Sequence, residues 1–522
     1  MMKFNFLSLF IFITYFHITS AITAGKSYLS LRPSFEAGTT ERTSIDHFLQ
    51  NLETDKKHFF EVVLFGGKAT KTSNIASYFL PSGTSCVSIA EDASPQCQCR
   101  DINAAYLNIV SAPVYNKTSA EIQALIPTMT YASQLQLSPK RHEIGIGFIY
   151  QVHFTDHLWF DISTAFTQIK QNIQPCECII NNGGTGPNGF GYQNLSCSMT
   201  STSISYGKIL NCNLKKNGVP QVDLRFGGIT SNEKNILNAF IGVDIPTGNK
   251  PCQRYMFEPV VGNNKHWGVF FSLGESFAIS KTDSYKISLS GDLLFRYLFT
   301  NTQLRSFDLK DKPWSRYMGV WKNNNALGSP AIASNCNEAF DRAEHLINYS
   351  TLCAQISPKA RFDGTFAINF DKNSWHTEIG YHVYANQAEE ICIKSNIYNN
   401  LGIEALANYF ILWGINDTPV TRSFADIKSY TFGAYPPVVD YIYNDGTYTA
   451  TYVPITTCDL DPNSAATPAQ FIHTLYATIG RTWSLSDHDV PFSLNFGASY
   501  DISGNNNAPN QWRLWLQLGL AF

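Results

Sequence analysis

Much of the chain alternates between apolar and polar residues with a period of two. Residues two apart share a face of a β-strand, so this alternation predicts strands with one apolar and one polar face. The last segment is the clearest example, because Arg513 and Gln517 stand between regularly spaced apolar residues. Those apolar positions are Trp512, Leu514, Leu516, Leu518, Leu520 and Phe522.

Twelve segments carry this pattern, and their lengths suit strands that cross a bilayer within a closed β-barrel. The predicted strands cover residues 58–67, 140–154, 157–169, 217–230, 236–246, 265–280, 285–299, 359–370, 375–387, 467–483, 490–503 and 511–522. Segments 104–110 and 122–136 could add another hairpin. We therefore expect an all-β, antiparallel transmembrane barrel of about 12 strands, within an even-numbered range of 12–16.

The links between these strands alternate between short and long. Bacterial barrels have short turns on the periplasmic side and long loops outside, so we expect Phe522 on the periplasmic side. The short links are 155–156, 231–235, 281–284, 371–374 and 484–489. The long links are 68–139, 170–216, 247–264, 300–358 and 388–466.

The first residues are typical of a secretory signal peptide. Lys3 precedes an apolar run over residues 4–16 that is too short to span a bilayer, and small residues follow it. We expect cleavage after Ala21, or alternatively after Ala24. Residues 22–57 are then an N-terminal periplasmic segment, with a short helix near Thr43, although a partial plug is an alternative. Residues 58–522 form the barrel and its extracellular loops.

The C-terminal strand resembles the assembly signal of bacterial outer-membrane β-barrels, because it closes an alternating apolar row with Phe522. No specific family is matched. The resemblance implies an outer-membrane location, contact with outer-membrane lipid and recognition by the barrel-assembly machinery. Composition agrees: charged residues are 15% of the chain, below the roughly 25% of soluble domains. A net charge of −3 argues against a nucleic-acid partner.

The chain contains twelve cysteines, and export to an oxidising compartment favours disulfides over metal binding. All of them fall in predicted outer loops, where disulfides would brace the loops. The disulfide candidates are Cys86, Cys97, Cys99, Cys176, Cys178, Cys197, Cys212, Cys252, Cys336, Cys353, Cys392 and Cys458.

The polar faces of the strands predict a lumen lined by charges of both signs, which suits a water-filled passage of low selectivity. The alternative is a plugged lumen in which these residues pair with one another. The candidate lumen-lining residues are Asp161, Asp223, Arg225, Asp244, Lys286, Asp292, Arg296, Arg361, Asp363, Glu378, His382, Asp501 and Arg513.

These features favour a porin-like channel for passive diffusion of ions and small polar solutes, as a monomer or a homo-trimer. Motifs of zinc hydrolases, serine hydrolases and P-loop enzymes are absent from the sequence, so we expect no enzyme activity and no cofactor. The alternative is a barrel-anchored adhesin or structural protein that acts through its cysteine-bearing loops.

Overall fold

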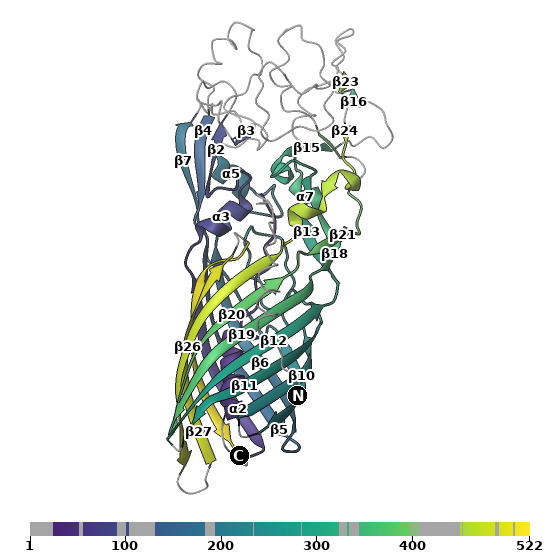
Figure 1. Cartoon of the computed structure of the whole chain (residues 1–522). Coiled ribbons are helices and arrows are strands. Elements are labelled where there is room, and N and C mark those ends of the chain that lie inside the picture. Colours follow the sequence, from purple (N-terminus) through teal and green to yellow (C-terminus); the bar gives the residue numbers. More distant parts are fainter. Residues whose placement is uncertain are drawn as a thin grey trace.

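A computed structural model describes residues 25–51, 56–90, 101–103, 131–182, 194–232, 234–282, 284–322, 331–332, 344–397, 401–403, 449–450, 453–485, 490–504 and 507–522. The predicted signal peptide lies outside this described part of the chain. The largest element is a closed antiparallel barrel of twelve strands (Figure 1). These strands are β1 (His58–Ala69), β5 (Lys140–His153), β6 (Leu158–Asn172), β9 (Val222–Ser231), β10 (Asn235–Ile245), β11 (Gly268–Lys281), β12 (Tyr285–Leu298), β19 (Lys359–Lys372), β20 (Trp375–Asn386), β26 (Gln470–Leu485), β27 (Val490–Ser503) and β28 (Gln511–Ala521).

The barrel closes because its first and last strands pair with each other. Strand β1 lies antiparallel to β28, from Phe59 opposite Ala521 to Ala69 opposite Gln511. Its other edge pairs with β5, and every later barrel strand pairs with its neighbour in sequence order. The predicted fold, a transmembrane barrel of about twelve strands, is therefore confirmed.

The outer face of the barrel is apolar and its inner face is polar, as the alternation predicts. On β28, the outward-facing Leu514 is 41% exposed, whereas the inward-facing Gln517 is 2% exposed. A bilayer core accepts strands only where every backbone hydrogen bond is made, as in a closed barrel. An apolar belt around such a barrel is the surface of an outer-membrane protein, so the chain is an outer-membrane β-barrel.

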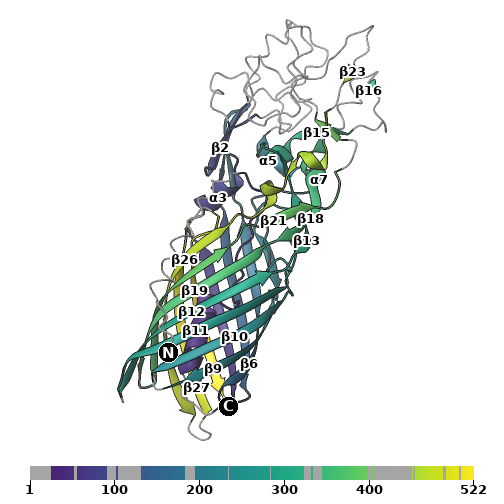
Figure 2. The same ribbon diagram turned by 45° about the vertical axis from the view of Figure 1, so that its right-hand side comes forward.

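The barrel has a turn end and a loop end. At the turn end, two to four residues separate the strands of each of the pairs β5/β6, β9/β10, β11/β12, β19/β20 and β26/β27. Long connections at the loop end build a separate layer, which we call the cap (Figures 1 and 2). None of the described helices is long and apolar enough to cross a bilayer.

The cap is made of short strands and helices. Its strands are β2 (Cys86–Ala90), β3 (Ile102–Asn103), β4 (Tyr131–Leu137), β7 (Pro175–Asn182), β13 (Asn301–Ser306), β14 (Asp308–Leu309), β15 (Gly319–Lys322), β16 (Ala331–Ile332), β17 (Glu344–His345), β18 (Thr351–Ser357), β21 (Glu390–Ile393), β22 (Leu401–Ile403), β23 (Thr449–Ala450), β24 (Val453–Pro454) and β25 (Leu460–Asp461). A further short strand, β8 (Leu214–Gly218), pairs with the loop end of β6. The helices are α3 (Ser73–Phe79), α5 (Leu195–Thr200) and α7 (Ile347–Ser350), with 3-10 turns η4 (Ser315–Tyr317), η5 (Thr457–Asp459) and η6 (Pro462–Ala465).

The cap has its own hydrophobic core. Phe79, Phe307, Trp314 and Tyr317 are each 1% exposed or less and belong to one packed cluster. The indole nitrogen of Trp314 donates to the Phe79 carbonyl at 2.6 Å, which satisfies its polar atom inside the core. The layer above the barrel is therefore a folded unit rather than a set of independent loops.

The N-terminal segment lies inside the barrel, and this corrects the predicted periplasmic segment. Its first described residue is in the cap, where Arg316 donates to the Gly25 carbonyl at 2.9 Å. The chain then descends into the lumen and forms helix α2 (Thr40–Asn51), drawn in purple within the ring of strands in Figure 1. The helix predicted near Thr43 thus begins at Thr40. Polar residues of the barrel wall form the hydrogen bonds and ion pairs with this segment that water would otherwise form in the periplasm.

The predicted disulfides are absent from the described part of the chain. The nine described cysteines, which exclude Cys97, Cys99 and Cys336, all have free thiols. Register explains this for β7, because its exposed Cys176 and Cys178 lie opposite Gln136 and Gln134 of β4 rather than opposite other cysteines. Spacing placed the cysteines in the loops, but pairing depends on strand register.

Candidate functional site

The candidate site is the barrel lumen together with the segment that fills it, residues 25–51, which we call the lumenal segment. Charged side chains of α2 reach strands on several sides of the ring. Glu41 contacts β28, Arg42 contacts β6, Asp46 contacts β9, and His47 contacts both β12 and β20. A helix that touches so many different strands must lie within the barrel, where it closes the passage at this level.

One attachment joins α2 to β6 and β9 through four charged side chains, of which Arg42, Asp161 and Arg225 are buried and Asp46 is half-buried. Arg42 donates to Asp161 at 2.7 Å. Arg225 donates to the same Asp161 at 2.9 Å and to Asp46 of the helix at 2.7 Å. Arg225 also lies over the rings of Trp159 and Phe240, 5.3 and 4.9 Å from their centroids. The helix and the wall thus each contribute one guanidinium group and one carboxylate, and each charge is offset by an opposite one.

The other side of α2 is held through His47. Its Nδ1 lies 3.0 Å from Glu378 of β20, and its Nε2 contacts Asp292 of β12. Glu378 is 0% exposed and also accepts a hydrogen bond from the hydroxyl of Tyr476 on β26. One helical side chain therefore links two strands of the wall through two carboxylates.

The extended stretch before α2 is fixed to the wall at a second level. Arg32 donates to Asp363 of β19 at 2.6 Å. Glu36 lies 2.9 Å from Arg296 of β12, which itself pairs with Asp244 of β10 at 2.9 Å. The Ala37 amide donates to Asp223 of β9 at 3.1 Å. Contacts at this level are independent of those made by α2.

Apolar contacts between the lumenal segment and the wall accompany these ion pairs. Phe35 stacks on Phe65 of β1 with ring centroids 5.5 Å apart. Its ring fills the space beside Gly147 of β5, where a Cβ atom would lie 2.3 Å from the Phe35 Cζ atom. Ile45 and Phe48 of α2 are 0% and 5% exposed within the same cluster. Gly147 is therefore required here by the close approach of the lumenal segment.

The structure places most of the predicted lumen residues in this network. Those buried on the inner wall are Asp161, Asp223, Arg225, Asp244, Arg296, Arg361, Asp363, Glu378, His382, Asp501 and Arg513. Asp292 is half-buried beside His47, and the half-buried Lys286 lies opposite Asp371 near the turn end. His382 is 0% exposed and lies 3.2 Å from Asp363.

Sequence reasoning missed the partners that the lumenal segment supplies. They are Arg32, Glu36, Glu41, Arg42, Asp46 and His47. The available signal was composition. This segment contains both acidic and basic residues, and it precedes strands whose polar faces are strongly charged. No group of His, Cys, Asp or Glu in the described chain is arranged to hold a metal ion.

Comparisons with known proteins add the fold alone. No family model matches the chain, and no curated protein matches its sequence. Among solved structures it is similar to an outer-membrane channel from Pseudomonas putida F1, with 10% identity, TM-score 0.35, and coverage of 90% of this chain and 97% of that one. It is also similar to the Pseudomonas putida toluene transporter TodX, with 8% identity, TM-score 0.30 and coverage of 96% and 95%.

A third similar structure is the transport unit of the autotransporter AIDA-I from Escherichia coli, with 8% identity and TM-score 0.27. Coverage is 94% of this chain and 99% of that chain. At identities and TM-scores this low, these likenesses carry no argument about what the present chain transports.

Proposed function

We propose that the protein is an outer-membrane channel for ions and small polar solutes, closed by its own lumenal segment. The observation that carries this proposal is the way α2 is held. Arg42, Asp46 and His47 hold α2 against the wall through ion pairs rather than through a continuous apolar interface. Charged walls remain wettable once a plug moves, whereas an apolar lumen would not.

Movement of the lumenal segment is the gating step of this proposal. Breaking one member of a buried ion pair leaves an uncompensated charge, which water entering the lumen can solvate. Two cavities that border the lumenal segment, one beside Arg32 and one beside Asp46, are small. In this proposal the transit of a solute requires displacement of the segment, and the resting channel is closed.

The test is conductance in planar bilayers. The wild-type protein should give rare or small steps, and the double variant R42A/D46A should give larger or more frequent steps. Both substitutions lie on the helix, so the charges of the barrel wall are unchanged. Gln50→Ala is the matched control, because Gln50 lies on the same helix but carries no charge. Silent bilayers for a variant that is folded, as judged by heat-modifiable migration, would reject the channel.

A second candidate is a barrel-anchored surface protein. The packed core of the cap favours it, because a folded outer layer around Trp314 offers a stable binding surface. In this case the filled lumen simply stabilises the anchor. R42A/D46A would then lower the stability of the barrel without producing conductance.

A further inference from the structure

Two charged side chains stand on the outer surface of the barrel, Glu275 within the apolar belt and Arg481 near the turn end, opposite the first residue of β20. Glu275 of β11 is exposed between Leu273 and Phe277, which are 53% and 45% exposed. The outward row of β11 continues with apolar residues in both directions, to Val269 and Ile279. The Glu275 carboxylate thus lies within the apolar belt.

The second charged residue is Arg481 of β26, whose outward neighbours in the strand are Ile479 and Trp483. Its guanidinium lies over the rings of Trp375 and Trp483, 5.4 and 5.2 Å from their centroids. Its Nε atom is buried and has no hydrogen-bond partner in the described part of the chain. Aromatic rings stabilise the cation in part, but no carboxylate among the described residues neutralises it.

Charges on the lipid face of a barrel are costly. The cost is greatest for Arg or Lys at the bilayer midplane and is smaller for carboxylates and for groups nearer the interface. Ionisable groups within a membrane usually face a partner of opposite charge for this reason. Glu275 and Arg481 carry opposite charges, so each neutralises the other when the two pair.

The two residues cannot meet within one barrel. Strands β12, β19 and β20 separate β11 from β26, which is four of the twelve strand-to-strand steps around the ring. We propose that copies of this chain associate side by side in the membrane, with Glu275 of one copy paired with Arg481 of the next. Because the two sites lie on different faces, the contact is head-to-tail and builds a row or a ring.

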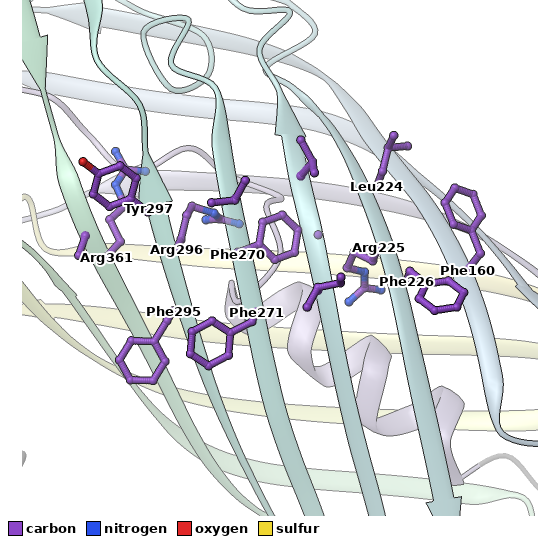
Figure 3. A pocket seen from close by; sticks show the side chains of 15 residues that line it. Phe160, Leu224, Arg225, Phe226, Phe270, Phe271, Phe295, Arg296, Tyr297 and Arg361 are labelled. Carbon is purple, nitrogen blue, oxygen red and sulfur yellow. The ribbon is translucent and has the colours of Figure 1, made fainter.

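The shapes of the two faces also match. An apolar groove of about 620 Å³ lies on the outer wall on the cap side of Glu275 (Figure 3). It is lined by outward-facing side chains that include Phe226, Val243, Phe271 and Phe295.

The face that carries Arg481 has protruding apolar side chains on the cap side of this residue. Ile379 of β20 and Leu475 of β26 are 64% and 57% exposed. Strands β11 and β26 both run from the cap toward the turn end, and Leu475 precedes Arg481 as Phe271 precedes Glu275. When Glu275 meets Arg481, these side chains face the groove. Close packing and polar contacts are the forces that join proteins within a membrane.

Charge-reversed variants test this contact. Donor and acceptor dyes on exposed cap thiols report association in phosphatidylcholine liposomes at high dilution in lipid. Wild-type copies should transfer energy above the level of random encounter. E275R alone and R481E alone should fall to that level, because each places like charges at the contact. An equal mixture of E275R and R481E should regain transfer, because every contact between unlike copies again joins opposite charges.

Controls separate association from folding. E275Q and R481Q remove the charges without reversal and should each reduce transfer, whereas F148Q should not, because it places a polar group on the outward face of β5, four strand steps from both β11 and β26. Heat-modifiable migration verifies that each variant is folded. Random-level transfer for the wild type, or no recovery in the mixture, would overturn the proposal and leave lipid or another protein as the partner of Glu275. The test does not depend on conductance.

Discussion

Arg42 of the lumenal helix and Asp161 of the barrel wall lie 2.7 Å apart, with exposed fractions of 1% and 0%. The two residues are far apart in sequence and belong to different structural layers. Asp161 also binds Arg225, which returns to the helix through Asp46. The pair therefore belongs to a network of four ion-paired side chains that joins the lumenal segment to the barrel wall.

This network predicts that removing different members lowers the free energy of unfolding by different amounts. D161A leaves both Arg42 and Arg225 without their shared carboxylate, so we expect a loss of about 3–5 kcal/mol in the free energy of unfolding. R42A should cost less, because Asp161 keeps Arg225. Urea unfolding of the liposome-embedded protein, followed by gel migration, measures both values. Equal losses for the two variants would contradict the assignment of Asp161 as the carboxylate that Arg42 and Arg225 share.

Gly147 should tolerate no side chain while Phe35 occupies its site. G147A places a Cβ atom 2.3 Å from the Phe35 ring, and overpacking of this kind costs about 1–3 kcal/mol. We expect lower stability and more frequent channel opening in planar bilayers, because displacement of Phe35 loosens the lumenal segment. The double variant G147A/F35A should recover part of the lost stability. A neutral G147A would place Phe35 elsewhere.

Buried His345 should make the cap sensitive to acid. Burial lowers the pKa of His345 below its usual value of 6.5, against a smaller opposing effect of its hydrogen bond with the Tyr317 carbonyl. The unfolded cap then binds a proton that the folded cap does not, so folded stability falls as pH drops below about 6.5. Limited proteolysis of the cap should be faster at pH 5 than at pH 7.5.

The control for this prediction is H345Q, which removes the titrating group. Its cap should show less difference in cleavage rate between the two pH values, whatever its absolute stability. An unchanged difference would assign the acid sensitivity to other titrating groups.

Free cap thiols provide a test of orientation. Cys353 of β18 and Cys392 of β21 are exposed in the cap and unpaired. Variants that retain only one of these cysteines should react with a membrane-impermeant maleimide on intact cells, without prior reduction. A matched variant with a single cysteine at Asn373, in a turn between β19 and β20, should react only after the outer membrane is opened. The reverse result would invert the assigned sidedness.

The barrel itself could be predicted from the sequence, since the outward or inward direction of a strand residue follows from its parity. Leu514 and Gln517 were placed on opposite faces by counting, and the structure puts them there. The twelve strand ranges agree with the structure to within a few residues at each end. Bilayer hydrocarbon selects for this pattern at every strand, so the signal repeats along the chain.

The filling of the lumen could not be predicted in the same way. Arg42, Asp46 and His47 have no period that shows where their partners lie, because those partners come from β6, β9, β12 and β20. Their charges suited periplasmic water as well as a polar lumen. The cysteines show the same limit, because their positions in loops followed from spacing but their pairing did not.

The sequence by itself determined a closed β-barrel with an apolar exterior, a charged interior and large outer loops. Only the tertiary structure decided that residues 25–51 enter the barrel and neutralise its wall, and that Glu275 and Arg481 lie four strand steps apart on its outer surface. The physical reason is that the local pattern of a strand depends on whether each residue faces the bilayer or the lumen. Ion pairing depends on which distant charges the closed ring brings within a few ångströms of each other.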